Sequence, residues 1–215
     1  LNLMNKVRFR LTNTIDLSVS AHYSRLSDVP RYDRLIQYKS DKLRYGDWYY
    51  GPQVWFMSSV QLSLNSPARF YDKAKITASV QDYTESRHDR NFGKDVMNEQ
   101  TEHVKIAGLN IDFDKDLKGD HEYLFYGFEF AFNDITSVAV KRNIVTEVTE
   151  KAGSRYPNGT NTYFNMAAYS GYKNNISQKL TISAGVRYNY VTLNSTISDN
   201  SFYSYPFSEI SIANG

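Results

Sequence analysis

The stretch Leu180-Thr-Ile-Ser-Ala-Gly-Val-Arg-Tyr-Asn-Tyr190 alternates apolar and polar side chains from end to end. Even-numbered positions are apolar or aromatic, while most odd-numbered positions are polar and include Arg187. A period of two residues predicts a β-strand with one apolar and one polar face. About ten residues is also the length with which a tilted strand crosses a bilayer.

The same alternation recurs along the chain. It is clear in residues 15–24, 74–81 and 124–132, and fainter in 3–11, 53–64, 103–113 and 163–172. His103 and Lys105 continue the apolar face of their stretch, so we expect them to lie above a membrane or beyond a β-bulge. The pattern predicts an all-β chain of about eight antiparallel, meandering strands.

The connections between these strands alternate in length. Short polar turns occupy residues 12–14, 65–68, 114–120 and 174–178, whereas the long connections cover 25–51, 85–98, 134–160 and 194–205. Alternating short turns and long loops is typical of transmembrane β-barrels, which have tight periplasmic turns and longer extracellular loops. The sequence therefore predicts an antiparallel transmembrane β-barrel.

Composition agrees with this class and excludes others. The chain has 215 residues, of which 41% are hydrophobic and 15% aromatic, with tyrosine the commonest aromatic residue. It has no run of 18 apolar residues, which excludes helical membrane spans. There is no cysteine, so disulfides and thiolate metal sites are excluded, and a net charge of +2 gives no reason to expect nucleic-acid binding.

Charged residues within the strands decide which face meets lipid. An outward Arg or Lys at mid-membrane would cost roughly 2–4 kcal/mol. We therefore expect the charged side chains of these strands to face the barrel lumen and any plug inside it; they are Lys73, Lys75, Glu129 and Arg187. Tyr188 and Tyr190, near a long connection, suit the aromatic girdle at the membrane surface.

Two other β architectures fit the alternation. In a soluble sandwich or lipocalin-like barrel that acts as a binding domain, the apolar face forms a core. A small complete barrel of eight strands, serving as an adhesin or structural protein, would close with side chains filling its interior.

Six segments carry a resemblance to a known family. They are Ser27-Asp-Val-Pro-Arg-Tyr-Asp-Arg-Leu35, Trp48-Tyr-Tyr-Gly-Pro-Gln53, His121-Glu-Tyr-Leu-Phe-Tyr-Gly-Phe-Glu129, Arg155-Tyr-Pro-Asn-Gly159, Leu180-Thr-Ile-Ser-Ala-Gly-Val-Arg-Tyr188 and Pro206-Phe-Ser-Glu-Ile210. In order and spacing they resemble the TonB-dependent outer-membrane receptors, particularly those of Bacteroidetes-type bacteria.

That resemblance implies a larger architecture. Members have an energy-coupling box, a plug domain and a barrel of about 22 strands. Because a plug, a coupling box and the terminal aromatic residue of a complete barrel are not found here, we expect residues 1–215 to be a middle part of the barrel domain. The implied function is TonB-dependent uptake of a scarce nutrient, most naturally an iron complex such as a ferric siderophore or haem. The implied partners are outer-membrane lipid, the protein's own plug and the TonB complex, in the outer membrane of a Gram-negative bacterium.

Candidate ligand-binding residues gather in the first long connection. Arginine pairs with carboxylates and stacks on flat groups, and aromatic rings suit conjugated ligands. We expect such a role for Arg31, Tyr32, Arg34, Trp48, Tyr49 and Tyr50. His88, in another long connection, is a candidate axial ligand of haem. The alternative is that this connection packs on itself, with Asp28, Asp33 and Asp47 pairing its arginines, and that His88 is a solvated loop residue.

Enzymatic motifs are missing from the sequence. It has no Gly-x-Ser-x-Gly elbow, phosphate-binding glycine loop or His-Glu-x-x-His pattern. We therefore predict neither catalytic residues nor a cofactor or metal site, and no enzymatic activity.

Overall fold

A computed structural model describes residues 1–117, 121–199, 201 and 209–214, the last of these as backbone only. The elements are β1 (Asn2–Arg10), β2 (Ile15–Leu26), β3 (Val29–Pro30), α1 (Tyr32–Leu35), β4 (Tyr38–Lys39), β5 (Lys42–Leu43), β6 (Tyr45–Tyr50), β7 (Gln53–Leu64), β8 (Lys73–Asn91), β9 (Val96–Asp116), β10 (Glu122–Asn143), β11 (Thr149–Lys151), β12 (Asn161–Ser177), β13 (Leu180–Thr196) and β14 (Glu209–Asn214). No helix among the described residues is long and apolar enough to span a bilayer.

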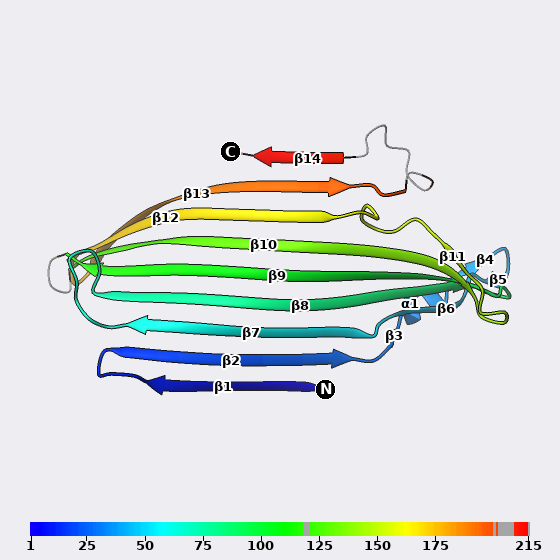
Figure 1. Ribbon diagram of the computed structural model, residues 1–215, viewed down its shortest axis with the longest axis horizontal. Coiled ribbons are helices and arrows are strands. Elements are labelled where there is room, and N and C mark those ends of the chain that lie inside the picture. The colour runs from blue at the N-terminus through cyan, green and yellow to red at the C-terminus, as the bar shows by residue number, and fades with distance from the viewer. Residues whose placement is uncertain (118–120, 200, 202–208, 215) are drawn as a thin grey trace.

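One antiparallel sheet carries the fold. Its main path runs β1-β2-β7-β8-β9-β10-β12-β13-β14, so neighbours in the sheet are also neighbours along the chain apart from the short elements. Figure 1 shows the β1–β2, β7–β8 and β12–β13 connections at one end of this sheet and β3 to β6, α1 and β11 at the other. The predicted meander and its asymmetric ends are confirmed.

Register sorts the side chains into two faces. Residues paired across antiparallel strands share a face, and one such row joins Phe9, Leu17, Leu62, Ile76, Ile111 and Phe128. The adjacent row joins Arg8, Ser18, Gln61, Thr77, Asn110 and Glu129. Apolar rows continue from Ala74 to Val80 on β8, about 20 Å along the strand. Alternation therefore produces one apolar and one polar surface over the width of the sheet.

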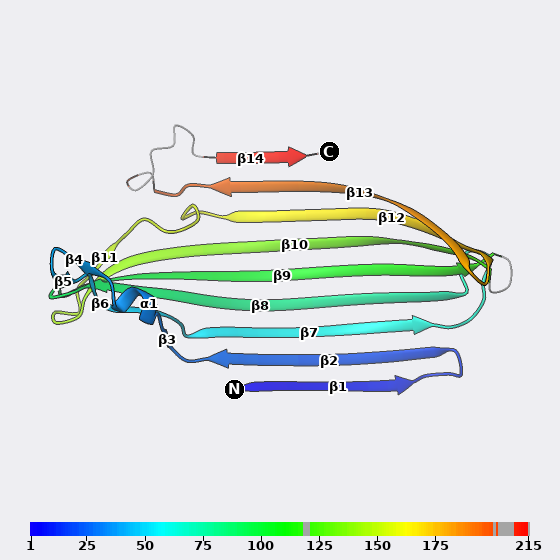
Figure 2. The same cartoon turned by 180° about the vertical axis from the view of Figure 1, so that it is seen from behind.

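The apolar surface is exposed. Val186 is 72% accessible and Phe128 45%, and no large side chain among the described residues is fully buried. A sandwich or lipocalin-like domain would bury this face in a core, so the described residues form neither of these architectures. The sheet is also open along its described length, with β1 and β14 as its edges (Figure 2). A closed eight-stranded barrel is therefore not what this chain forms.

Several predicted long connections are partly strand. β8, β9 and β10 have 19, 21 and 22 residues, about twice the length that crosses a bilayer. β8 and β9 meet through a four-residue turn at 92–95, so the predicted loop at 85–98 is wrong. His103 and Lys105 lie in uninterrupted register, which also excludes a bulge there. Beyond the apolar band both faces of these strands carry polar residues, so the alternation fades while the hydrogen-bonded pairing continues.

Candidate ligand-binding and lumen-facing surfaces

The predicted ligand loop forms part of the sheet at its long-connection end. β6 pairs with β8 at the level of His88 and Arg87, directly beyond the pairing of β7 with β8. The break between β6 and β7 is at Gly51, whose φ of +109° suits glycine. A side chain at Gly51 would also collide with the Ser27 carbonyl oxygen. The aromatic residues of β6 are therefore fixed to the sheet and alternate between its faces.

Arg31, Trp48 and Tyr50 come together on the polar face. Tyr50 pairs with Arg87 and Trp48 with Asp89, both polar-face positions of β8. The Arg31 guanidinium lies 5.1 Å from the Trp48 ring centroid and donates to the Tyr50 hydroxyl at 3.0 Å. It also binds Asp33 through two hydrogen bonds of 2.7 Å. Those bonds lower the pKa of Asp33 and raise that of Arg31, so the pair stays charged.

Helix α1 carries two further candidates of this connection, Tyr32 and Arg34, and holds them less firmly. The Arg34 guanidinium is 6.0 Å from the Trp48 ring centroid and 3.8 Å from the Asp33 carboxylate. Its Nε is buried without a hydrogen-bond partner. Tyr32 is 72% exposed. The self-packing interpretation therefore holds for Arg31 and Asp33, whereas Asp47 pairs with Arg90 of β8, outside this connection.

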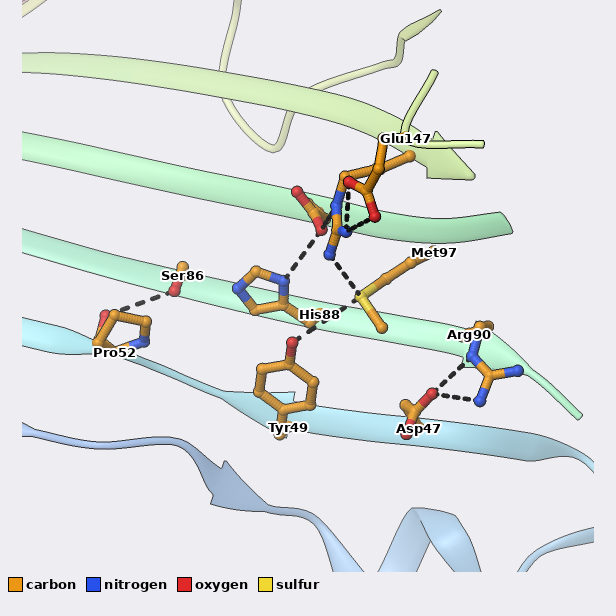
Figure 3. Close-up of polar contacts among 10 residues, drawn as sticks. Asp47, Tyr49, Pro52, Ser86, His88, Arg90, Met97 and Glu147 are labelled. Atoms are coloured by element: carbon orange, nitrogen blue, oxygen red, sulfur yellow. Dashed lines mark hydrogen bonds and ion pairs between the residues drawn. The ribbon is translucent and has the colours of Figure 1, made fainter. Parts of the chain in front are cut away.

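Tyr49 and His88 lie together on the opposite face. Their rings stack at 4.6 Å with an interplanar angle of 9°, and both belong to the face that is apolar lower in the sheet. Figure 3 shows them beside Met97, whose sulfur accepts from the Tyr49 hydroxyl at 3.8 Å. His88 is therefore a half-buried member of a cluster, and it does not converge with Arg31.

An ion-pair network completes this cluster. Arg142 of β10 donates to Glu99 at 2.7 Å and to Glu147 at 3.2 Å. The Glu99 carboxylate lies 3.9 Å from His88 Nδ1, which is buried without a hydrogen-bond partner. Burial lowers the pKa of His88 and raises that of Tyr49, so both side chains are neutral at pH 7.

A second polar-face cluster, which the sequence did not single out, lies beside the Arg31 group. Glu85 and Glu102 face each other across β8 and β9, and Glu102 is only 4% exposed. Burial, and then the charge of Glu85, raise the pKa of Glu102. Arg155, from the connection before β12, reaches Glu85 at 3.4 Å. Counting alternate residues onward from 74–81 would have placed Glu85 and Arg87 on the polar face.

The four predicted lumen-facing residues all lie on the polar face. Arg187 forms an ion pair with Glu129. Lys75 stands opposite Asp112 and Lys73 opposite Asp114, and neither lysine has an ion pair with the described residues.

The Tyr169 hydroxyl crosses the backbone of Gly127 to donate to Asp112. A β-carbon at Gly127 would collide with the Tyr169 ring, so the glycine makes this crossing possible.

The described residues include no group of three or more His, Cys, Asp or Glu side chains placed to hold a metal ion. What the polar face offers is a series of guanidinium groups, aromatic rings and carboxylates on a rigid sheet. Such groups bind ligands or another protein surface through hydrogen bonds and ion pairs.

Comparisons with known proteins rest on structure alone. No protein-family model and no curated protein sequence matches the chain. The ferric yersiniabactin uptake receptor FyuA from Yersinia pestis superposes on 99% of this chain with a TM-score of 0.66 and 12% identity, over 33% of its own length. The copper transporter OprC superposes on 99% with a TM-score of 0.69 and 9% identity, over 32% of its length. The chain therefore has the fold of about a third of a TonB-dependent receptor barrel, and spans about a third of the length of these proteins.

Proposed function

We propose that this chain forms part of the barrel wall of a TonB-dependent importer in the outer membrane of a Gram-negative bacterium. The observation that carries the proposal is the division of one sheet into an exposed apolar face and a polar face. Lipid would cover the apolar face. The plug would lie against the polar face, where Lys73, Lys75, Glu129 and Arg187 offer it charged contacts, and the TonB complex would act through the plug.

The proposed cargo is a ferric siderophore. Arg31, Trp48 and Tyr50 present guanidinium and aromatic groups on the polar face, the face that a ligand entering the lumen would meet. Arg87 lies beside them and Arg155 binds the neighbouring Glu85. Arginine and aromatic rings suit anionic, conjugated iron chelates. One structural neighbour takes up a ferric siderophore, which agrees with this choice.

Haem is the less favoured cargo because of where His88 lies. An axial ligand needs an imidazole nitrogen open to the iron. His88 stacks on Tyr49, and its side chain is 15% exposed on the face away from Arg31. We therefore do not assign His88 to the ligand.

Uptake of radioactive iron by whole cells tests the proposal. Cells that lack the gene should lose uptake of one class of ferric siderophore, and a protonophore should abolish the uptake in cells that keep it. Uptake that survives both treatments contradicts the proposed importer.

Variants on the two faces then test the site. Arg31→Ala should weaken binding of that siderophore by about tenfold, as expected for the loss of a charge-assisted hydrogen bond. Asp33→Asn should strengthen it, because it frees the Arg31 donors. His88→Ala is the matched control and should bind as the wild type does. Loss of binding in His88→Ala alone would favour haem instead.

A further inference from the structure

Two methionines flank a histidine on the polar face of the sheet. Met4 of β1 and Met57 of β7 are the residues paired with His22 of β2, one on each side. The three strands lie side by side at the N-terminal edge of the sheet (Figure 1). The chain has four methionines, so half of them meet at one imidazole. Residues paired in this way share a face, and their side chains can touch.

The backbone pattern places Met4 closest to the imidazole. Leu1 and Arg25 exchange both of their backbone hydrogen bonds, each 2.8 Å long. Hydrogen-bonded and non-hydrogen-bonded pairs alternate along antiparallel strands, so Met4 and His22, three pairs further on, form a non-hydrogen-bonded pair. The α-carbons of such a pair are about 4.5 Å apart, whereas those of His22 and Met57, which bond through the backbone, are about 5.5 Å apart. The flexible, unbranched methionine side chain spans either distance.

His22 has its ring nitrogens available. Its side chain is half-buried, and it makes no hydrogen bond or ion pair with any residue that the structure describes. The ring meets that of Trp55 edge to face, with centroids 4.9 Å apart and an interplanar angle of 87°. The Trp55 indole nitrogen in turn donates to the Gln81 side chain at 3.1 Å. Trp55 therefore restrains the imidazole and covers one side of it.

The donor atoms gathered here are soft and uncharged. Two thioether sulfurs and one imidazole nitrogen favour Cu(I), and the similar Ag(I), over harder ions that prefer oxygen ligands. A divalent ion would also keep its full double charge in such a set. Among the described residues, the adjacent rows of this face on β1, β2 and β7 contain no carboxylate; they hold Asn2, Ser24 and Trp55 on one side and Lys6, Ser20 and Ser59 on the other. Lys6 is exposed, so its flexible side chain keeps the ammonium group in water.

We propose that Met4, His22 and Met57 form a binding site for Cu(I). The two thioethers and one imidazole nitrogen coordinate the ion, and Trp55 shields one side of the site. The three ligands are far apart in the sequence and no motif links them, so only the pairing of the strands brings them together. This site goes beyond the proposed function, because it depends on the register of three strands and not on the identity of the cargo.

Competition for Cu(I) tests the site. The protein, extracted from the outer membrane at its natural length, is titrated under reducing, oxygen-free conditions against a chromophoric Cu(I) chelator, whose loss of colour reports transfer of the ion. The wild type should take Cu(I) from the chelator, Ag(I) should displace it, and an excess of Zn(II) should not. X-ray absorption by the bound copper should show both sulfur and nitrogen ligands.

Variants remove the ligands one at a time. Met4→Leu and Met57→Leu each delete a sulfur and nearly conserve side-chain volume. Each should weaken Cu(I) binding by at least about tenfold, an effect that even outer-shell changes have on metal affinity. His22→Phe keeps a ring against Trp55 and should abolish the site. Met166→Leu, on the apolar face of β12, is the matched control for a lost thioether and should bind as the wild type does.

Three results would overturn the site. They are unchanged Cu(I) affinity in Met57→Leu, unchanged affinity in His22→Phe, and displacement of Cu(I) by Zn(II). Met57→Leu decides the matter even where His22→Phe fails to fold, because leucine preserves the packing, and heat-dependent gel mobility confirms folding. Iron uptake by Met57→Leu cells should equal that of the wild type. Normal iron uptake by a wild type that binds no Cu(I) contradicts this site alone, whereas Cu(I) binding without iron uptake contradicts the proposed function alone.

Discussion

Introducing an arginine at neighbouring positions of β8 tests the assignment of the two faces. Ala78 lies on the exposed apolar face, paired with Val60 and Leu109. Thr77 lies on the polar face, paired with Gln61 and Asn110. The residues are adjacent in sequence, so Ala78→Arg and Thr77→Arg differ chiefly in the face that receives the charge.

The expected difference follows from the place of Ala78 in the apolar band. Its row is the third of four between Ala74 and Val80, near the middle of that band. An arginine facing lipid near the midplane costs roughly 2–4 kcal/mol, whereas lumen substitutions mainly tune selectivity. At about 1.4 kcal/mol per factor of ten, Ala78→Arg should lower the folding equilibrium constant by roughly 30-fold to 700-fold.

The assay is denaturant unfolding of the protein in phospholipid vesicles. Tryptophan fluorescence reports the transition, and heat-dependent gel mobility confirms that each variant inserts. Ala78→Leu is the control for added bulk on the same face and should not destabilise the protein. If Thr77→Arg loses as much stability as Ala78→Arg, the face assignment is wrong.

Three further predictions concern single positions. Gly127→Ala should cost about 1–3 kcal/mol, because the new methyl group collides with the Ile111 carbonyl oxygen and the Tyr169 ring. Gly171→Ala, whose β-carbon would meet only ordinary contacts, should change stability by less than about 0.5 kcal/mol, and thermal unfolding compares the two variants. The lowered pKa of His88 means that the folded state binds fewer protons than the unfolded one, so protection of β6 from hydrogen exchange should be full above pH 6.5 and fall as the pH drops through the folded pKa. His88→Phe, which keeps a ring at the stack, should remove that dependence, and an unchanged profile would contradict it. Arg142→Gln should raise the pKa of His88, because the positive charge that lowers it is lost. The folded and unfolded pKa values then lie closer together, so β6 should lose less protection at low pH than in the wild type.

Much of the fold was predictable because the alternation of apolar and polar residues is strong. In residues 180–190 and 124–132 one face of the strand is apolar throughout, so both faces show directly in the sequence. The same alternation placed Glu129 and Arg187 on the polar face. It gave no guide beyond the apolar band, where β8, β9 and β10 continue with polar residues on both faces.

The candidate site was predictable in composition but not in grouping. The loop that contains Arg31, Trp48 and Tyr49 was visible in the sequence, yet β6 was not, and pairing of β6 with β8 sends Trp48 and Tyr49 to opposite faces. Glu99 and Arg142 are more than 40 residues apart and meet only because β9 and β10 are paired in register.

The sequence by itself determined that strands alternate in character, that they turn tightly at one end, and which side of each strand is apolar. These properties depend on neighbouring residues and on the solvent, so they are written locally in the chain. Only the tertiary structure decided which side chains share a surface, because cross-strand register brings together residues far apart in sequence. The group of Arg31, Trp48 and Tyr50 and the cluster around His88 both arise from that register.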